Sequence, residues 1–214
     1  SAAILIDDGT IIPAKSIGSD QISVGEIVFN TSMTGYQEII TDPSYDRQII
    51  TFTNPHIGNT GINFDDYESN ENGCSGIIMR NHPTHDSSWR KQHSLLDFLL
   101  NNSIPALCSV DTRYLTSLLR KKGSLNGCLV PDIKKLDDAK SELSKFSGLS
   151  GLDLAKKVST EKIYTWNEGT HALISSSSQR STKRYNVYAY DFGIKKNILR
   201  ILYDLGCDIT VVPA

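Results

Sequence analysis

The stretch that decides the fold is residues 29–48, which read FNTSMTGYQEIITDPSYDRQ. It is polar and dense in turn-forming residues, yet two short apolar runs enclose it: IVF at 27–29 and IITF at 49–52. Both runs are rich in β-branched or aromatic residues, which favours buried strands. The sequence therefore predicts a polar loop held at each end by a strand.

Two turns are predicted inside this loop. Gly35 permits backbone angles that a larger residue resists, and Asp42-Pro43 biases the chain away from helical dihedral angles. The hydroxyls of Ser44 and Tyr45 follow the second turn, at the loop tip. On residue types alone an ordinary solvated connection is favoured. A loop that binds a ligand is the alternative, because binding residues often lie on loops positioned by a rigid scaffold.

Length and composition narrow the class of protein. The chain has 214 residues, 39% of them hydrophobic, enough for one large domain or for one and a half smaller ones. A formal net charge of -2 argues against a nucleic-acid-binding or anionic-membrane-binding surface. No apolar run reaches bilayer-spanning length, and residues 1–9 are interpreted as a first strand, not a signal peptide.

The four cysteines are predicted to be free and buried. Cys74, Cys108, Cys128 and Cys207 form no C-x-x-C pair, and two of them lie in apolar, strand-like runs. Reduced thiols are typical of the cytoplasm, which is the expected compartment.

The rest of the chain alternates between strand and helix patterns. Strands are expected at 2–6, 10–14, 24–31, 48–53, 77–79, 104–110 and 128–130, and helices at 93–101, 111–122, 137–146 and 152–158. The acidic stretch 63–73 is expected to be exposed, and Asn126-Gly127 to form a turn. For the first two helices the expected inward residues are Leu95, Leu96, Leu99, Leu100, Leu115, Leu118 and Leu119.

Residues 175–184, SSSSQRSTKR, lack any apolar side chain and are predicted to be a flexible linker. A strand at 185–190, a helix at 194–205 and a strand at 208–212 then predict one βαβ unit, so the fold class is α/β. The inward residues of that helix are expected to be Ile194, Ile198, Ile201, Leu202 and Leu205.

Several residues invite a chemical interpretation that the pattern does not favour. Cys74 lies in GCSG, one residue short of a nucleophile elbow and before a strand, and Cys207 begins a strand. His82 and His85 lie in an irregular loop without the spacing of metal ligands. We therefore expect neither a catalytic cysteine nor a metal site in the chain.

The start of the last predicted helix offers two further motifs. Asp191-Phe192-Gly193 matches a kinase triplet, but no phosphate loop precedes it, so a simple turn is expected. Lys195, Lys196 and Arg200 lie opposite the predicted apolar stripe. They form either a solvated face or a contact with a partner or with further sheet.

Longer motifs carry a resemblance to a known family. They are GEIVFNTSMTGYQE at 25–38, TDPSY at 41–45, NPHIGN at 54–59, DTR at 111–113, GLSGLDLA at 148–155 and YDFGIKKNI at 190–198. In this order, over nearly the whole chain, they resemble the small subunit of glutamine-dependent carbamoyl-phosphate synthase.

The resemblance implies a domain plan. Residues 1–150 would be the amino-terminal domain, a swivelling β/β/α fold, and residues 151–184 a connecting segment and linker. Residues 185–214 would begin a flavodoxin-like class I glutamine amidotransferase domain.

The resemblance also implies a function. The subunit would supply ammonia from L-glutamine to a large subunit, a ligase that makes carbamoyl phosphate for arginine and pyrimidine biosynthesis in a cytoplasmic heterodimer. ATP and a divalent metal would belong to the large subunit, with no cofactor in this chain.

Of the family's site residues, only Ser44 carries over, as a glutamine-binding hydroxyl. The elbow cysteine, histidine and glutamate are expected beyond Ala214, so this chain alone is expected to be inactive. The alternative is a non-catalytic module that docks on the large subunit and couples the two sites.

Overall fold

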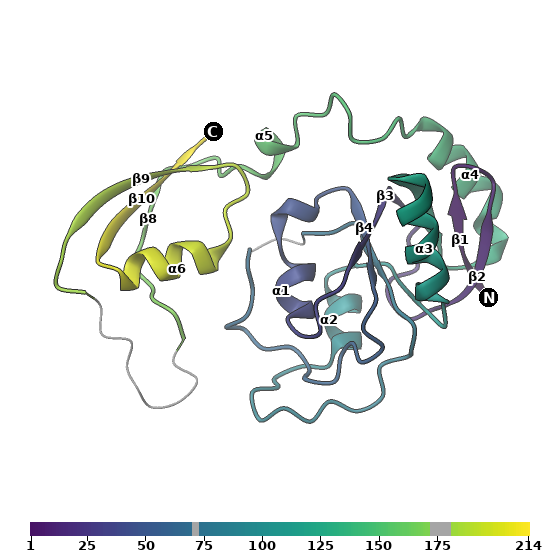
Figure 1. Cartoon of the computed structure of the whole chain (residues 1–214), viewed down its shortest axis with the longest axis horizontal. Coiled ribbons are helices and arrows are strands. Elements are labelled where there is room, and N and C mark those ends of the chain that lie inside the picture. Colours follow the sequence, from purple (N-terminus) through teal and green to yellow (C-terminus); the bar gives the residue numbers. More distant parts are fainter. Residues whose placement is uncertain (70–72, 172–180) are drawn as a thin grey trace.

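The computed structural model describes residues 1–69, 73–171 and 181–214, and its larger part is a closed β-barrel (Figure 1). Around the barrel the strands follow the order β1-β2-β6-β5-β4-β3-β7, and β7 pairs with β1 to close it. Their bounds are β1 (Ala2–Ile6), β2 (Ile11–Ser16), β3 (Ser23–Asn30), β4 (Gln48–Phe52), β5 (Gly76–Ile78), β6 (Ala106–Cys108) and β7 (Leu125–Val130). The strands predicted at 2–6 and 10–14 correspond to β1 and β2, which pair antiparallel.

The barrel mixes antiparallel and parallel pairing. Strands β3, β4, β5 and β6 run parallel to one another, whereas β1, β2 and β7 pair antiparallel with their neighbours. Parallel neighbours need a crossover connection. The connection from β3 to β4 is the stretch predicted as a loop, and it contains helix α1 (Tyr36–Ile40) and the 3-10 turn η1 (Pro43–Tyr45). The prediction of plain loop was incomplete because Tyr36 and Ile40, one helical turn apart, both bury their side chains.

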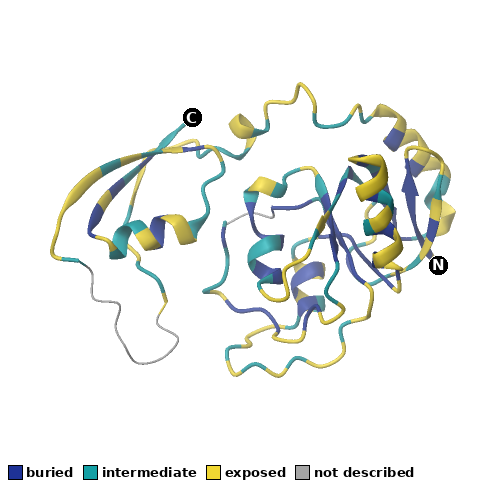
Figure 2. Ribbon diagram, in the orientation of Figure 1, coloured by how far each residue is buried: buried dark blue, intermediate teal, exposed yellow. Residues whose placement is uncertain are grey.

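The core lies on both sides of the barrel strands (Figure 2). Helices α1 and α2 (Leu95–Asn101) pack with Ile40 and Leu99 against Phe52, and α3 (Thr112–Lys122) packs with Leu115 against Ile49. Helix α4 (Leu136–Lys145) covers β7. Burying a leucine or isoleucine side chain completely stabilises the folded protein by about 1.5–3 kcal/mol. These contacts therefore fix the helices against the barrel strands.

Three predictions about the barrel were wrong in detail. Leu100 is 55% exposed and Phe98 takes its place in the core, because the leucine-rich pattern of α2 fits two faces. Asn126 lies inside β7, where it pairs with β3, so residues 126–127 do not form a turn. Asn63 and Glu68 are buried, although their acidic, polar stretch was expected to be exposed.

A second sheet follows the short helix α5 (Leu154–Val158) and lies beside the barrel (Figure 1). It has the order β8-β10-β9, and its elements are β8 (Tyr164–Trp166), β9 (Tyr185–Asp191), α6 (Lys196–Asp204) and β10 (Cys207–Pro213). The parallel β9–α6–β10 unit confirms the predicted βαβ pattern. Strand β8 was not predicted. Residues 175–180 of the predicted linker lie outside the described residues.

The predicted inward face of α6 was partly wrong. Leu199 is buried against the sheet and Leu202 packs beside it, whereas Ile198, Ile201 and Leu205 are 47%, 46% and 59% exposed. The helix carries apolar residues on more than one side, so spacing alone does not say which side meets the strands.

Candidate functional site

The β3–β4 connection is held from within by Asp42. Its side chain accepts a hydrogen bond from the Ser44 backbone N–H at 2.9 Å, which caps η1. Asp42 is buried, while Ser44 is exposed beside it. Among the described residues the Ser44 hydroxyl has no hydrogen-bond partner. The turn therefore presents a hydroxyl that an outside ligand can engage.

Buried polar bonds join this connection to the segment after it. The Thr41 hydroxyl donates to the Gln37 carbonyl at 2.9 Å and accepts from the Glu68 N–H at 3.0 Å. The Gln37 amide accepts from the Asn63 N–H at 3.0 Å and donates to the Asn63 carbonyl at 2.5 Å. Buried polar groups of this kind are costly to leave unpaired, so helix α1 and residues 63–68 hold one another in place.

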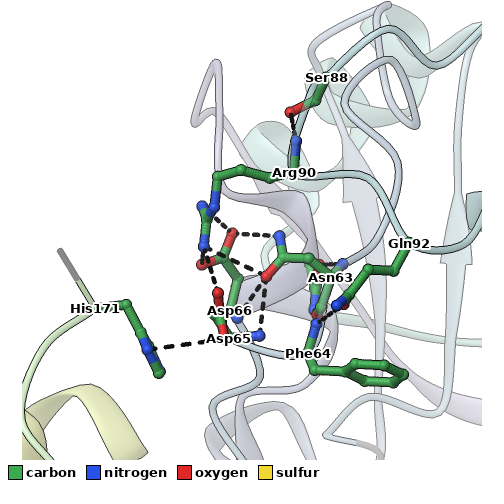
Figure 3. A network of polar contacts seen from close by, with 9 residues as sticks. Asn63, Phe64, Asp65, Asp66, Ser88, Arg90, Gln92 and His171 are labelled. Atoms are coloured by element: carbon green, nitrogen blue, oxygen red, sulfur yellow. Dashed lines mark hydrogen bonds and ion pairs between the residues drawn. The ribbon is translucent and has the colours of Figure 1, made fainter. Parts of the chain in front are cut away.

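A cluster around Arg90 fixes the same segment from its outer side (Figure 3). The guanidinium donates to both carboxylate oxygens of Asp66, at 2.9 and 2.8 Å. Asn63 donates to Asp66 at 2.7 Å, and His171 lies 3.7 Å from Asp65. The bidentate pair is the strong element here, because Arg90 is only 19% exposed. The pKa of Arg90 is raised, and its hydrogen bonds to Asp66 contribute most to that rise.

The β3–β4 connection and the segment after it also bond to the start of helix α6, in the β9–α6–β10 unit. Lys195 Nζ lies 2.7 Å from Asp42 Oδ2, and this hydrogen bond raises the pKa of Lys195. Glu68 accepts from the Lys196 N–H through its carbonyl and from the Asn197 N–H through Oε2, both at 3.0 Å. Helix α6 has no side-chain cap of its own, so Glu68 satisfies two N–H groups at its first turn.

The turn before α6 is built to approach the connection closely. Asp191 Oδ1 accepts from the N–H groups of Gly193 and Ile194 at 2.9 Å each. Gly193 has φ +88°, and a Cβ there would lie 2.8 Å from Val158 and 3.3 Å from Pro43. The triplet at 191–193 is thus a structural turn, as predicted, and its glycine is required for space as well as for backbone angle.

A cavity of about 1080 Å³ opens along this contact between the two units. Pro43, Asp46, Glu68, Asp191 and Lys196 are among its lining residues. Ser44 is not among the described residues that line it, although its neighbour Pro43 is. The connection therefore forms part of the cavity wall.

None of the four thiols has the surroundings of a nucleophile. All four are free and buried, as predicted. Burial raises the pKa of Cys74 to about 12, and that of Cys128 also to about 12. A thiolate is the reactive species, so Cys74 and Cys128 are inert at neutral pH.

The other residues considered as functional candidates are a loop histidine, possible metal ligands and Arg200. His82 lies in an irregular loop, where its Nδ1 is 2.6 Å from the Pro83 carbonyl. Residues 1–69, 73–171 and 181–214 hold no group of His, Cys, Asp or Glu suited to a metal ion. Arg200 is buried, so it is not the solvated residue that was the simpler expectation.

Sequence reasoning found part of this site and missed the rest. It singled out Ser44 and the turn at Asp42, and it left a partner contact open for Lys195. It missed Glu68, whose acidic neighbours made it look like a solvent-exposed residue. The role of Glu68 depends on its contact with the start of α6, and the sequence carries no local pattern that predicts this contact.

Comparison with known proteins assigns the chain to a family. Residues 4–129, which hold most of the barrel, match the family model described as carbamoyl-phosphate synthase small chain, CPSase domain. That is more than half of the chain, and the chain belongs to this family.

Similar proteins extend the match over the whole chain. It is 49% identical over 218 residues to the carbamoyl phosphate synthase small chain of Vibrio parahaemolyticus. Identity to the proteins of that name from Thioalkalivibrio sulfidiphilus and Xanthomonas campestris is 50% and 48%. Each alignment covers 100% of this chain but only 57%, 56% and 57% of the respective relative. The chain thus spans little more than half the length of these relatives.

Structural similarity adds little to the family assignment. An aminopeptidase from Aneurinibacillus sp. strain AM-1 aligns with 61% of this chain and 30% of its own, at 12% identity and a TM-score of 0.34, too low to support an argument. Separately, no described helix combines the length and apolar character required to cross a bilayer.

Proposed function

We propose that this chain is the amino-terminal part of a glutamine-hydrolysing carbamoyl-phosphate synthase small subunit. Such a subunit would supply ammonia from L-glutamine to a large subunit that makes carbamoyl phosphate for arginine and pyrimidine biosynthesis. The observation that carries the proposal is near 50% identity to small chains over all 214 residues. The large subunit would hold ATP and a divalent metal, and the complex would be cytoplasmic.

The proposal includes a division of the chain. Residues 1–150 form the amino-terminal domain of the swivelling β/β/α type, and residues 151–184 connect it to the second unit. Residues 185–214 begin a flavodoxin-like glutaminase domain. The closed barrel and the separate parallel βαβ unit support this division.

Within this function, Ser44 helps to bind glutamine. Its hydroxyl is exposed on a turn that Asp42 caps. The same carboxylate pairs with Lys195 at the start of α6, so the turn is fixed relative to the βαβ unit. A hydroxyl can donate to the carboxylate of an amino-acid substrate or accept from its ammonium group.

The chemical step is assigned to the part of the longer relatives that this chain does not cover. The support is the state of the thiols, since all four cysteines are buried and Cys74 has a pKa of about 12. A second role is compatible with this assignment: residues 1–150 would act as a docking module that binds the large subunit and couples its site to the glutaminase site.

Ammonia release from glutamine tests the assignment. We expect none above background from the 214-residue chain, and release from the longer subunit assembled with its large partner. Release by the short chain that disappears in Cys74→Ala would overturn the proposal and point to an independent enzyme.

A further inference from the structure

The barrel carries a second cavity on the side away from the βαβ unit. It has a volume of about 820 Å³ and is lined by Thr53, Pro55, Arg80, Thr112, Arg113, Thr116, Ser117, Arg120 and Lys121. None of these residues takes part in the contact between the β3–β4 connection and helix α6. A volume of this size is typical of sites for small organic ligands.

The position in the fold is one at which ligands bind. Strands β4, β5 and β6 run parallel, and the lining residues follow their carboxyl ends. Thr53 comes directly after β4, Arg80 follows β5, and Arg113 opens the helix after β6. Ligands bind at the carboxyl ends of parallel strands both in open α/β sheets and in (β/α)8 barrels.

The lining is strongly positive although the chain as a whole is not. Four cationic side chains line the cavity and none of the described lining residues is acidic, in a chain of net charge -2. Within the described residues, Arg80, Arg113, Arg120 and Lys121 have no carboxylate partner. Lys122, the next residue along α3, does pair with Asp8. The cavity therefore brings these four cations, which lack a described carboxylate partner, together at one place.

The donors available in the cavity fit a phosphate. Arginine presents a planar fork of N–H groups that binds phosphate oxygens in pairs. Ser117 offers a further hydroxyl on the same helix, whereas the Thr53 and Thr116 hydroxyls already donate to backbone carbonyls. Pro55 adds an apolar surface, and no aromatic ring is present among the described lining residues to stack on a nucleobase.

We propose that this cavity binds a small organic phosphate, with the phosphate held between Arg80, Arg113 and Arg120. The volume leaves room for an organic group beyond the phosphate itself. The site is independent of the proposed glutamine contact, since the two share no residue. An acidic segment of a partner protein is the competing occupant, and a volume of about 820 Å³ within the range of small-ligand sites favours the small ligand.

Calorimetric titration of the full chain with inorganic pyrophosphate, at constant ionic strength, tests the proposal. We expect saturable binding at one site. Arg113→Gln combined with Arg120→Gln should weaken it by roughly tenfold or more, because two of the three guanidinium groups proposed to hold the phosphate are lost. The matched control, Lys134→Gln with Lys140→Gln on exposed positions away from the cavity, should bind as the parent does.

Three results would overturn the proposal. The first is heat that does not saturate, and the second is equal binding by the arginine variant when circular dichroism shows it folded. The third is a hexaglutamate peptide that binds through the same arginines more tightly than pyrophosphate, which would assign the cavity to a protein partner. If Arg113 and Arg120 cannot be replaced without unfolding, Arg80→Gln and Ser117→Ala provide the same test.

Discussion

The ion pair between Asp42 and Lys195 should be worth much more than a surface pair, because one partner is buried. The Asp42 side chain is 5% exposed and that of Lys195 is 43% exposed. Exposed pairs contribute about 0–1 kcal/mol, and losing the partner of a fully buried charge costs about 3–5 kcal/mol. The half-exposed lysine puts this pair between those limits, with a coupling energy of about 1–2 kcal/mol.

A double-mutant cycle measures that coupling. The variants are Asp42→Asn, Lys195→Met and the double substitution, and asparagine keeps an oxygen that can accept from the Ser44 N–H. Urea unfolding is followed by the fluorescence of Trp89 and Trp166, of which Trp166 lies in β8 of the second sheet. The control cycle uses Glu142 and Lys145, an exposed i,i+3 pair with side chains 53% and 64% exposed, where about 0.3–0.5 kcal/mol is expected.

The pH dependence of the coupling has a definite sign. The pKa of Lys195 is raised in the folded protein by its hydrogen bond to Asp42. The stabilisation is therefore fully present below the unfolded lysine pKa of about 10.4 and is lost as pH rises through the higher folded value. A coupling at pH 7 no larger than that of the control pair would refute the reasoning.

Further predictions concern the neighbouring turn, the half-buried Glu38 carboxyl and the thiols. Gly193→Ala should cost about 1–2 kcal/mol more in unfolding free energy than Gly151→Ala, because both glycines have positive φ but only at Gly193 would a Cβ meet other atoms. Equal losses in urea melts would contradict this. Burial raises the pKa of Glu38, so stability falls as pH rises from the unfolded carboxyl pKa through the folded one. Glu38→Gln should then stabilise the protein by about 0.5 kcal/mol at pH 7 and change nothing near pH 3, and the reverse order would count against it. Cys74 and Cys128 should not react with a thiol reagent in the native protein at pH 7 but should react fully in denaturant; rapid native labelling would show the thiols to be accessible.

Local patterns predicted much of this fold. Strands β1 and β2, helix α3 and the β9–α6–β10 unit were all predicted from the apolar spacing and the turn residues of the sequence. Each of these elements is signalled by residues close together in the chain, so a local sequence pattern is enough to predict it.

The errors arose where long-range contacts decide. Strand β8 is three residues long and exists through its pairing with β10, some forty residues later. Glu68 is buried because it bonds the start of α6. Helix α1 forms in a polar connection because Tyr36 and Ile40 enter a core shared with α2. None of these partners lies in the local window from which a pattern is read.

The candidate site divides in the same way. Ser44 and its turn follow from the sequence, and the family resemblance assigned it a glutamine contact. The bonds from Asp42 and Glu68 to the start of α6 depend on how two separate units meet, which spacing along the chain does not describe.

The most direct test is the glutamine KM of the longer subunit, assembled with its large partner, carrying Ser44→Ala. Loss of one hydrogen bond to a charged substrate group should raise KM roughly tenfold, with little change in kcat. Ser144→Ala, an exposed serine on α4, is the matched control and should leave both constants unchanged. An unchanged KM in Ser44→Ala would remove the β3–β4 connection from the glutamine site.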